Sequence, residues 1–357
     1  MFLGLKEFSS SIQSILGSKN QNIAIAADND LDGLFSAILL DIGLYNLYEI
    51  ETEVFFRDEL RWEIPIDNNF DVLFLLDLAF DNTPNYRKIV SRAKNTYAID
   101  HHITQETGFP VKVNLYNPCF EGQCYQPATF LVNRVITELG NDNNPLCQYL
   151  NLLGVLADAG INFRTSNNEI KYSFDPSITP LYENGKKNFK DLFEVKQFGN
   201  YVYPHFKAVI EALNLEAADL GWNEMHLRFI NEAENQAQAE QIVKKMHKKH
   251  EEAYKELLKK IPKQPTDIST ESGVWIVKNT TSIGNGSLAR VMAEMLDKPV
   301  IAYKCAKTCR VSARAPAESK INFIPIFENY GGGHPKACGA FLTPKRFSEL
   351  FEKIKKA

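Results

Sequence analysis

The sequence has few of the features that mark a specialised class of protein. Its six cysteines form no CxxC pair, so a structural zinc site is not indicated and we expect reduced thiols. No apolar run approaches the roughly 20 residues that span a membrane, and the N-terminus becomes polar too quickly for a signal peptide. The net charge of -4 also lacks the positive excess of many nucleic-acid-binding proteins. We therefore expect a soluble, cytoplasmic protein in which local basic residues and metal ions would hold any nucleic acid.

The composition favours a folded chain with more than one domain. Its 357 residues are 44% hydrophobic, which is enough to bury sizeable cores. In the first half, short apolar runs alternate with helical patterns, as is typical of a doubly wound α/β sheet. The expected strands are Ile23–Ala27, Val72–Leu76 and Thr96–Ile99, and a helix is expected over Leu34–Leu47.

Acidic residues follow each of these expected strands. Asp28, Asp77 and Asp100 stand at the three carboxyl ends. Ligands of open parallel sheets bind outside the carboxyl ends of the strands, so these acids are expected to converge. The first belongs to the segment "DNDLDG" at 28–33, in which three aspartates repel one another unless a cation or backbone donors lie among them. The segment therefore suggests a metal site.

Other readings of this segment fit less well. A calcium-binding EF-hand loop needs a bidentate Glu at position 12, where the chain has Leu39. Haloacid-dehalogenase phosphatases carry a similar "DLDG", but a Thr normally follows it, whereas Leu34 follows here. A solvated acidic turn is the remaining alternative. A stronger interpretation depends on motifs further along the chain.

The second half has a different pattern. Apolar residues recur at helical spacing among many Lys and Glu residues, which predicts one long amphipathic helix over 231–261. Pro262 and Pro265 then mark a linker. From Gly273 the chain reads as short strands and turns, which predicts a second, smaller α/β domain. Within it, alternation along "RVSAR" places Arg310, Ser312 and Arg314 on one strand face, where two guanidinium groups and a hydroxyl suit successive phosphates.

Six motifs in order resemble the DHH phosphoesterase superfamily. They are "DNDLDG", the aspartate of "LFLLDLAF", "DHH" at 100–102, the aspartate of "GVLADAG", and the C-terminal "RVSAR" and "GGGHPKACGAF", which are similar to the associated DHHA1 domain. The resemblance implies an α/β fold with a doubly wound parallel-sheet DHH domain over 1–185, a helical connector over 186–265 with the long helix, and a smaller α/β DHHA1 domain over 266–357.

The resemblance also implies a site for two Mn²⁺ ions, with Mg²⁺ as the alternative, and the ligand types suit such hard cations. In several members a histidine stands where this chain has Ala26, so Asp28 is assigned to complete the first site. The implied metal ligands are Asp28, Asp30, Asp32, Asp77, His101 and Asp158, with Asp77 bridging the two ions. Asp100 would hold a histidine ring or a metal-bound water, and His102 would face the substrate. The implied substrate-binding residues are Arg310, Ser312, Arg314, Gly332, Gly333 and His334.

Two metal ions can stabilise both the attacking and the leaving oxygen of a displacement at phosphorus. The resemblance therefore implies a phosphoric ester hydrolase. The first expectation is a Mn²⁺-dependent exonuclease that acts on single-stranded DNA or short oligonucleotides. The alternatives are a hydrolase of small nucleotides, such as adenosine bisphosphate or linear or cyclic dinucleotides, a pyrophosphatase or exopolyphosphatase, and an inactive nucleic-acid-binding scaffold. No membrane partner is expected, and a homodimer is left open.

Overall fold

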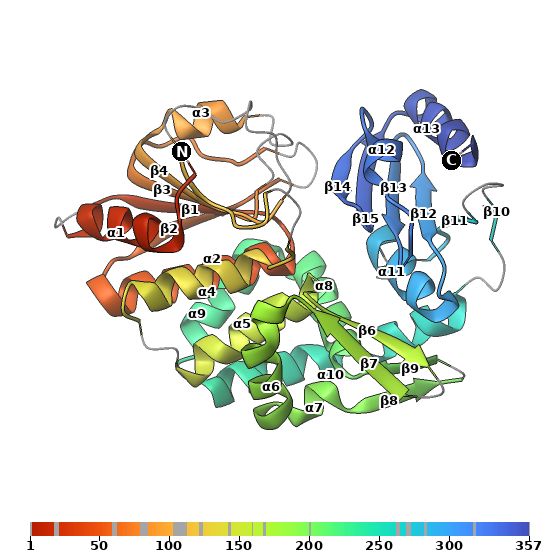
Figure 1. Ribbon diagram of the computed structural model, residues 1–357, viewed down its shortest axis with the longest axis horizontal. Coiled ribbons are helices and arrows are strands. Elements are labelled where there is room, and N and C mark those ends of the chain that lie inside the picture. The colour runs from red at the N-terminus through yellow and green to blue at the C-terminus, as the bar shows by residue number, and fades with distance from the viewer. Residues whose placement is uncertain are drawn as a thin grey trace. The chain divides into compact units, whose positions relative to one another are not determined.

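The structure is a computed structural model that divides into two compact units (Figure 1). Unit 1 comprises residues 1–196 and 203–250, and unit 2 comprises 197–202 and 251–357. The predicted connector, residues 186–265, is thus shared between the units. The structure describes residues 2–17, 21–58, 63–78, 85–102, 113–120, 124–141, 144–158, 160–166, 169–199, 201–261, 265–268, 273–281, 284–316 and 319–356.

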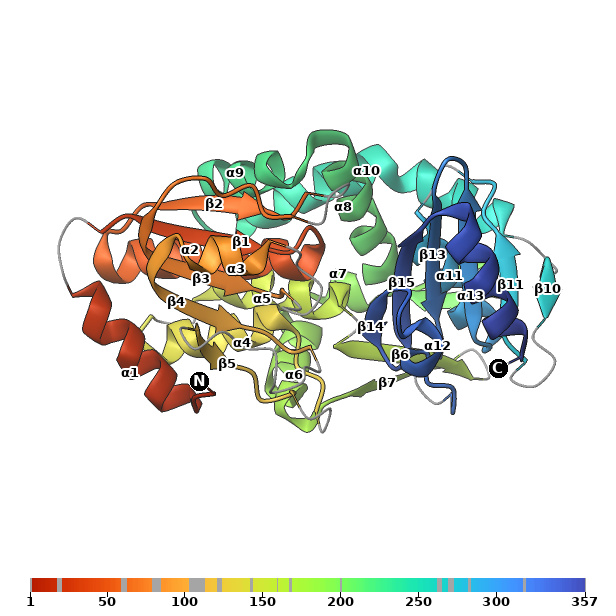
Figure 2. The ribbon, with the colours of Figure 1, turned by 90° about the horizontal axis from the view of Figure 1, so that it is seen from above.

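Unit 1 is built on a five-stranded parallel sheet with the order β2-β1-β3-β4-β5. Figure 2 shows these strands side by side in this order. After β1 the chain adds β2 on one side and then crosses to β3 on the other, so the direction of winding reverses between β1 and β3. This confirms the doubly wound α/β class, and such a reversal is where ligands bind in these sheets. The strands are β1 (Ile23–Ala27), β2 (Thr52–Phe56), β3 (Phe70–Leu76), β4 (Ala93–Ile99) and β5 (Val113–Tyr116).

Helices cover both faces of this sheet, and Figure 1 shows α2 and α4 on one side and α3 on the other. Within the described residues, α2 is the one helix long and apolar enough to cross a membrane by length and composition. It is apolar all round because it packs against three other helices, α4, α5 and α9, as the central helix of a folded domain does. The helices are α1 (Leu5–Leu16), α2 (Leu31–Tyr48), α3 (Tyr86–Val90), α4 (Ala128–Glu138) and α5 (Pro145–Ala157).

The chain then forms two β-hairpins and a series of helices. The predicted single helix over 231–261 is wrong at its start, because α9 ends at Glu232 and α10 begins at Gln236. Asn235 separates them, since its side-chain oxygen accepts a hydrogen bond from the Gln238 N–H and so caps a new helix. These elements are β6 (Ile161–Ser166), β7 (Glu169–Phe174), the 3₁₀ turn η3 (Pro176–Ile178), α6 (Thr179–Asn188), α7 (Lys190–Phe193), β8 (Val195–Phe198), β9 (Tyr201–Pro204), α8 (Phe206–Leu220), α9 (Trp222–Glu232) and α10 (Gln236–Lys260).

Unit 2 contains a six-stranded mixed sheet with the order β10-β11-β12-β13-β15-β14. One face packs on α12 and α13 in an apolar core, and α11 connects the parallel strands β11 and β12. The elements are β10 (Asp267–Ile268), β11 (Trp275–Lys278), α11 (Asn285–Leu296), β12 (Val300–Cys305), β13 (Cys309–Arg314), α12 (Ile324–Phe327), β14 (Gly332–His334), β15 (Ala337–Leu342) and α13 (Pro344–Lys356).

Candidate metal centre

The segment "DNDLDG" joins β1 to α2, and its residues are needed for that turn as well as for charge. Asp30 is the N-cap of α2, and its Oδ1 accepts a hydrogen bond of 2.9 Å from the Gly33 N–H. A Cβ atom on Gly33 would lie 2.4 Å from the Asp28 carbonyl oxygen, so only glycine allows the helix to start so close to the strand. The turn therefore brings the carboxylates to the end of β1.

Asp77 follows β3 and has a left-handed backbone conformation, which residues other than glycine rarely adopt. Its φ is 57°, and its N–H donates to the Ile99 carbonyl at the end of β4. Its Oδ1 lies 3.1 Å from His101 Nε2 and, among the described residues, is a buried oxygen that accepts no hydrogen bond. A buried carboxylate oxygen without a donor is costly unless a cation lies beside it. This atom fits a metal ligand.

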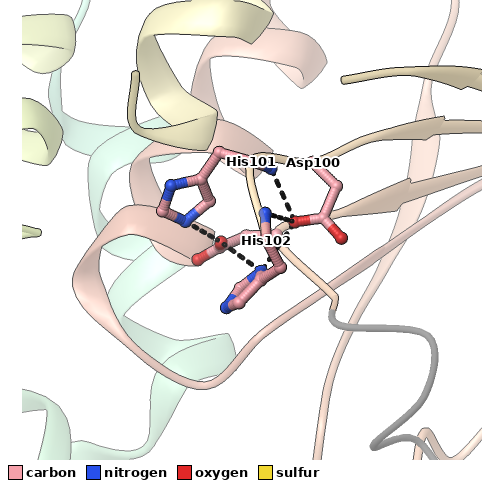
Figure 3. Close-up of side chains that lie close together, drawn as sticks. Asp100, His101 and His102 are labelled. Atoms are coloured by element: carbon pink, nitrogen blue, oxygen red, sulfur yellow. Dashed lines mark hydrogen bonds and ion pairs between the residues drawn. The ribbon is translucent and has the colours of Figure 1, made fainter. Parts of the chain in front are cut away.

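The "DHH" residues follow β4, as predicted, and Figure 3 shows how they are arranged. Asp100 Oδ1 accepts hydrogen bonds from the backbone N–H groups of His101, at 2.7 Å, and His102, at 3.2 Å. The same oxygen lies 2.7 Å from His102 Nδ1. Asp100 therefore fixes the orientation of the His102 ring.

The six predicted ligands, together with Asp100 and His102, form three overlapping groups that could hold a cation. In each group one donor atom per residue lies within 4.8 Å of all the others. The first and second groups share His101, and the first and third share Asp77, so adjacent sites with common ligands fit this arrangement. Carboxylates, alone as in the third group or with one or two imidazoles as in the other groups, suit Mn²⁺ or Mg²⁺. The groups are Asp77, Asp100, His101 and His102; Asp32, His101 and Asp158; and Asp28, Asp30 and Asp77.

Asp28 and Asp32 have further partners that the sequence did not predict. Arg57, which directly follows β2, places Nη2 2.6 Å from Asp28 Oδ2. Asp32 is buried, and its two carboxylate oxygens accept hydrogen bonds from the N–H groups of Ala128, at 2.7 Å, and Thr129, at 2.8 Å. The Thr129 hydroxyl donates to Asp32 as well. Asp32 thus binds the N-terminus of α4, where free N–H groups favour a negative charge.

Asp158 ends α5 and is held by Tyr125. The Tyr125 hydroxyl lies 2.6 Å from Asp158 Oδ2 and 2.9 Å from the Asp158 carbonyl oxygen. His101 Nε2 lies 3.6 Å from the same Oδ2. The aromatic hydroxyl therefore orients the carboxylate that faces the histidine.

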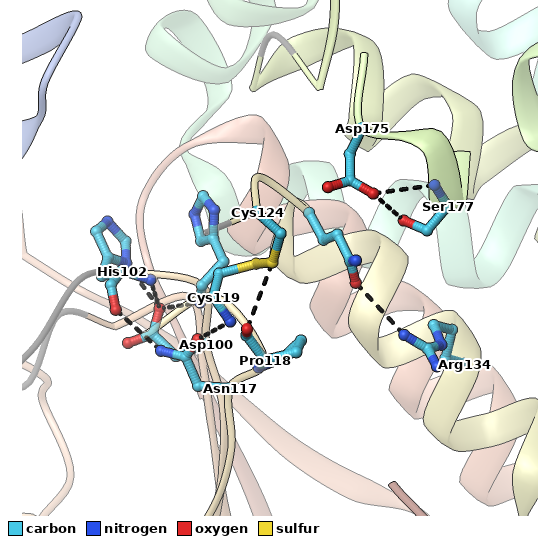
Figure 4. The surroundings of a disulfide bond; sticks show 11 residues. Asp100, His102, Asn117, Pro118, Cys119, Cys124, Arg134, Asp175 and Ser177 are labelled. Atoms are coloured by element: carbon cyan, nitrogen blue, oxygen red, sulfur yellow. Dashed lines mark hydrogen bonds and ion pairs between the residues drawn. A yellow bond between two sulfur atoms is a disulfide. The ribbon is translucent and has the colours of Figure 1, made fainter. Parts of the chain in front are cut away.

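A disulfide lies beside the histidines (Figure 4). Cys119 is bonded to Cys124, and the Asn117 side chain joins this pair to the site, because it donates to the His102 carbonyl at 2.9 Å and accepts from the Cys119 N–H. A second disulfide joins Cys305 to Cys309. The expectation of reduced thiols is thus wrong for both pairs. In the second pair, the hairpin of β12 and β13 places the two residues directly opposite each other.

Burial and charge shift the proton affinities in the site. Burial and the neighbouring carboxylates raise the pKa of Asp77 and Asp32 well above the usual value and that of Asp30 to about 6. Burial lowers the pKa of His101 to about 4. Burial also opposes the charged form of His102, but the charge and hydrogen bond of Asp100 outweigh it and raise its pKa to about 9. Without a cation, Asp30, Asp32 and Asp77 therefore hold their protons more tightly than ordinary carboxyl groups do.

In unit 2 the structure places three of the predicted substrate-binding side chains on one face of β13. Arg310 is exposed, and Ser312 and Arg314 are half-buried, while Cys309, Val311 and Ala313 between them face the core. Gly333 has a φ of 140°, and a Cβ there would lie 2.1 Å from the Ala337 carbonyl oxygen. Gly332 pairs with Gly339 in the neighbouring strand. The backbone of His334 lies in β14, and its side chain is outside the described part of the structure.

No family model matches this sequence, and no curated protein matches it. Solved structures do. RecJ from Thermus thermophilus, solved with Mn²⁺ and also with Mg²⁺, aligns in its Mn²⁺ form with a TM-score of 0.63 and 18% identity over 98% of this chain. The chain spans 54% of that RecJ. The DHH domain of a protein described as a member of a ribosomal protein family gives a TM-score of 0.71 at 15% identity, covering 99% of this chain and 90% of that one.

The chain has a DHH-superfamily fold. An exopolyphosphatase-related protein from Bacteroides fragilis is a further neighbour, with a TM-score of 0.54 and 13% identity over 98% of this chain and 96% of that one. The predicted resemblance to this superfamily is thus confirmed at the level of the fold, including the parallel sheet. In this DHH fold the acids at the ends of β1, β3 and β4 lie at the point where the strand order reverses.

Sequence reasoning missed four residues that contact this centre. They share no motif, and each reaches the site from another element. Arg57 had the clearest signal, because it directly follows the apolar run "VFF" of β2, a strand that was not predicted. The other three, Asn117, Tyr125 and Thr129, lie between β5 and the first turn of α4.

Proposed function

We propose that this chain is a metal-dependent phosphodiesterase, and specifically a Mn²⁺-dependent exonuclease that hydrolyses single-stranded DNA or short oligonucleotides to mononucleotides. One observation carries the proposal. Asp77 belongs to two of the groups of candidate ligands, and it lies where the strand order of the DHH fold reverses. Its buried Oδ1 accepts no hydrogen bond among the described residues. A carboxylate in this position suits a ligand common to two cations.

The proposed metal ligands are Asp28, Asp30, Asp32, Asp77, His101 and Asp158. Two divalent ions held by such residues supply charge stabilisation for displacement at phosphorus. His101 suits ligation, because burial lowers its pKa to about 4 and its ring is therefore neutral at pH 7.

His102 suits the donation of a proton. The Asp100 carboxylate overcomes the effect of burial and raises the pKa of His102 to about 9, so its ring is protonated at pH 7. Asp100 also holds Nδ1 at 2.7 Å, and in the proposed reaction the ring would donate its Nε2–H to a phosphoryl oxygen or to the leaving group. Asp100 would thus position the ring and stabilise its charge.

The exposed side of β13 in unit 2 supports binding of the substrate's phosphates. The side chains of Arg310, Ser312 and Arg314 lie on this side at alternate positions. Guanidinium groups bind phosphate oxygens through two parallel hydrogen bonds, and a hydroxyl adds a further donor. A hydrolase of small nucleotides would use the same groups, and the fold shared with an exopolyphosphatase-related protein makes polyphosphate a further candidate.

The experiment compares substrates with one enzyme preparation. The purified chain is incubated with Mn²⁺, Mg²⁺ or EDTA and with end-labelled single-stranded DNA, short RNA, adenosine bisphosphate, cyclic dinucleotides or polyphosphate. We expect mononucleotides from DNA or short oligonucleotides with Mn²⁺ and no product with EDTA. Turnover of adenosine bisphosphate or cyclic dinucleotides alone would favour the small-nucleotide reading. Release of phosphate from polyphosphate alone would exclude a nuclease, and DNA binding without any product would favour a scaffold.

A matched pair of variants tests the metal assignment. Asp77→Asn removes a charge from both candidate sites. Loss of a residue that only supports a metal ligand lowers activity by roughly 10- to 100-fold, and we expect the turnover of Asp77→Asn to fall by more than this. Asp71→Asn changes an acid at the other end of the same strand, where Asp71 pairs with Lys94, and should leave turnover unchanged. Near-normal activity of Asp77→Asn would overturn the two-metal assignment.

A further inference from the structure

We propose that Phe341 is a stacking platform for a nucleobase, so that the face of the unit 2 sheet that carries Arg310 binds a nucleotide by its base as well as by its phosphates. This inference rests on the proposed function and narrows its substrate class to nucleotides and oligonucleotides. The observation behind it is an aromatic side chain placed beside cations on the sheet face opposite the core formed with α12 and α13.

The sheet register places Phe341 in a row across three strands. Arg310 in β13 pairs with Lys304 in β12 on one side and with Phe341 in β15 on the other. Residues directly opposite each other in neighbouring strands project to the same face. Lys304 and Arg310 are both exposed, and within the described chain no carboxylate forms an ion pair with either. The row is therefore cationic and ends on an aromatic ring.

Phe341 is exposed in a strand whose neighbours are buried. Its side chain is 38% exposed, whereas Ala340 and Leu342 on either side face the apolar core of unit 2. The Arg310 guanidinium carbon lies 5.4 Å from the centre of the Phe341 ring, which is cation–π distance. Covering an exposed phenyl ring with a flat apolar group is favourable. Any of the nucleobases can stack on such a ring, because each has a flat π face.

The neighbouring rows leave room beside this ring. Ser312 pairs with Gly339 and Arg314 with Ala337, so the part of β15 that lies next to Phe341 on this face carries only small residues. The N-terminal turn of α11 adjoins the same face, because Asn285 Nδ2 donates to the Arg310 carbonyl at 2.7 Å. No acidic residue lies in that first turn. The face thus combines donors for phosphate with one ring for a base.

Phosphate donors alone would not distinguish a nucleotide from polyphosphate, because both ligands present the same oxygens. A ring beside the phosphate donors does distinguish them, since only the nucleotide has a planar group that stacks. Stacking of one base changes affinity by about 5- to 150-fold. Phe341 is therefore a residue that sets specificity for the class of substrate.

The test measures binding in EDTA, so that hydrolysis does not interfere. The probes are a 5′-phosphorylated dinucleotide that contains 2-aminopurine and its abasic counterpart with the same phosphates, titrated into the full chain. We expect 2-aminopurine fluorescence to change on binding, which gives the affinity. Phe341→Ala should weaken binding of the aminopurine probe by about 5- to 150-fold and leave binding of the abasic probe within about twofold.

Two further variants serve as controls. Phe341→Trp keeps a flat ring and should retain binding, and Ile268→Ala removes another exposed apolar side chain of unit 2 and should have no effect. The platform would be overturned by any of three results. These are equal binding of the aminopurine probe by Phe341→Ala and the parent chain, an equal loss of binding of both probes in Phe341→Ala, or no binding of the aminopurine probe by the parent chain.

Hydrolysis in Mn²⁺ separates this inference from the proposed function. A parent chain that cleaves no nucleic acid or nucleotide but binds the aminopurine probe through Phe341 would refute the activity and support the platform. A parent that cleaves oligonucleotides, with the same KM in Phe341→Ala, would support the activity and refute the platform.

Discussion

Arg57 and Asp28 form a largely buried ion pair at the ends of neighbouring strands β2 and β1, with Nη2 2.6 Å from Oδ2. The two side chains are 8% and 13% exposed, so the pair is shielded from water. Burial raises the pKa of Asp28, with a smaller contribution from the Asp100 carboxylate, while the charge of Arg57 opposes this rise. Asp28 therefore has a permanent cationic partner in addition to any metal ion.

Removal of one partner of this pair should be costly. We expect Arg57→Gln to lower the unfolding free energy of the metal-free chain by about 3 kcal/mol, because it leaves a buried charge without its partner. The double variant Arg57→Gln/Asp28→Asn should recover most of this loss, since neither side chain is then charged. Urea unfolding in EDTA gives these values. Additive losses in the double variant would show that the two side chains are not coupled.

Tyr125 should control metal affinity through Asp158. Tyr125→Phe keeps the ring and removes the hydroxyl that holds Asp158 Oδ2, so we expect Mn²⁺ affinity to fall about 10-fold, with turnover recovered at saturating Mn²⁺. Calorimetric titration with Mn²⁺ measures the affinity. Tyr97→Phe is the matched control, because Tyr97 is buried and donates instead to the Ser11 carbonyl. Equal affinities of the two variants would exclude a positioning role for Tyr125.

The contact between Asp32 and α4 should contribute to stability apart from metal binding. Thr129→Val removes the hydroxyl that donates to Asp32 with little change in volume, and we expect a loss of about 2 kcal/mol in the metal-free chain. Thr137→Val on the same helix removes an exposed hydroxyl and should cost less than about 0.5 kcal/mol. Chemical unfolding in EDTA compares the two. A similar small loss in both variants would argue against this anchor.

Stabilisation by Mn²⁺ should increase with pH. Burial and neighbouring charges raise the pKa of Asp30 from 3.8 to about 6, so the folded, metal-free chain binds this proton more tightly than the unfolded chain. The resulting stability is complete below pH 3.8 and is lost as the pH rises through 6. Above that pH the carboxylates repel one another, and a cation relieves the repulsion.

Thermal unfolding at about pH 5 and about pH 7.5, with and without Mn²⁺, tests this dependence. We expect the rise in Tm on adding Mn²⁺ to be clearly larger at the higher pH, and the difference between the two pH values to shrink in Asp30→Asn, which cannot ionise. An equal rise in Tm at both pH values in the parent chain would contradict the assignment of protons to these acids.

The sequence predicted those parts of the site in which an acidic residue or a histidine directly follows a clear strand pattern. The strand Ile23–Ala27 was placed with its observed bounds, and the other two expected strands lie within β3 and β4. Because side chains alternate along a strand and parallel strands end at one edge, the acids after β1, β3 and β4 could be expected to meet before the fold was known. β2 was not predicted, since its sequence "TEVFF" mixes polar with apolar residues, whereas the equally short β1 is wholly apolar.

Other contacts depend on residues that lie far apart in the sequence. Thr129 reaches Asp32 across 97 positions, and a Cβ on Gly154 would lie 2.2 Å from the Thr129 hydroxyl oxygen, so this contact requires the close packing of α4 against α5. The sequence by itself determined the acids, the histidines and the strand ends that carry them. Only the tertiary structure decided which donor faces each carboxylate, because the packing of the helices on the sheet sets those distances.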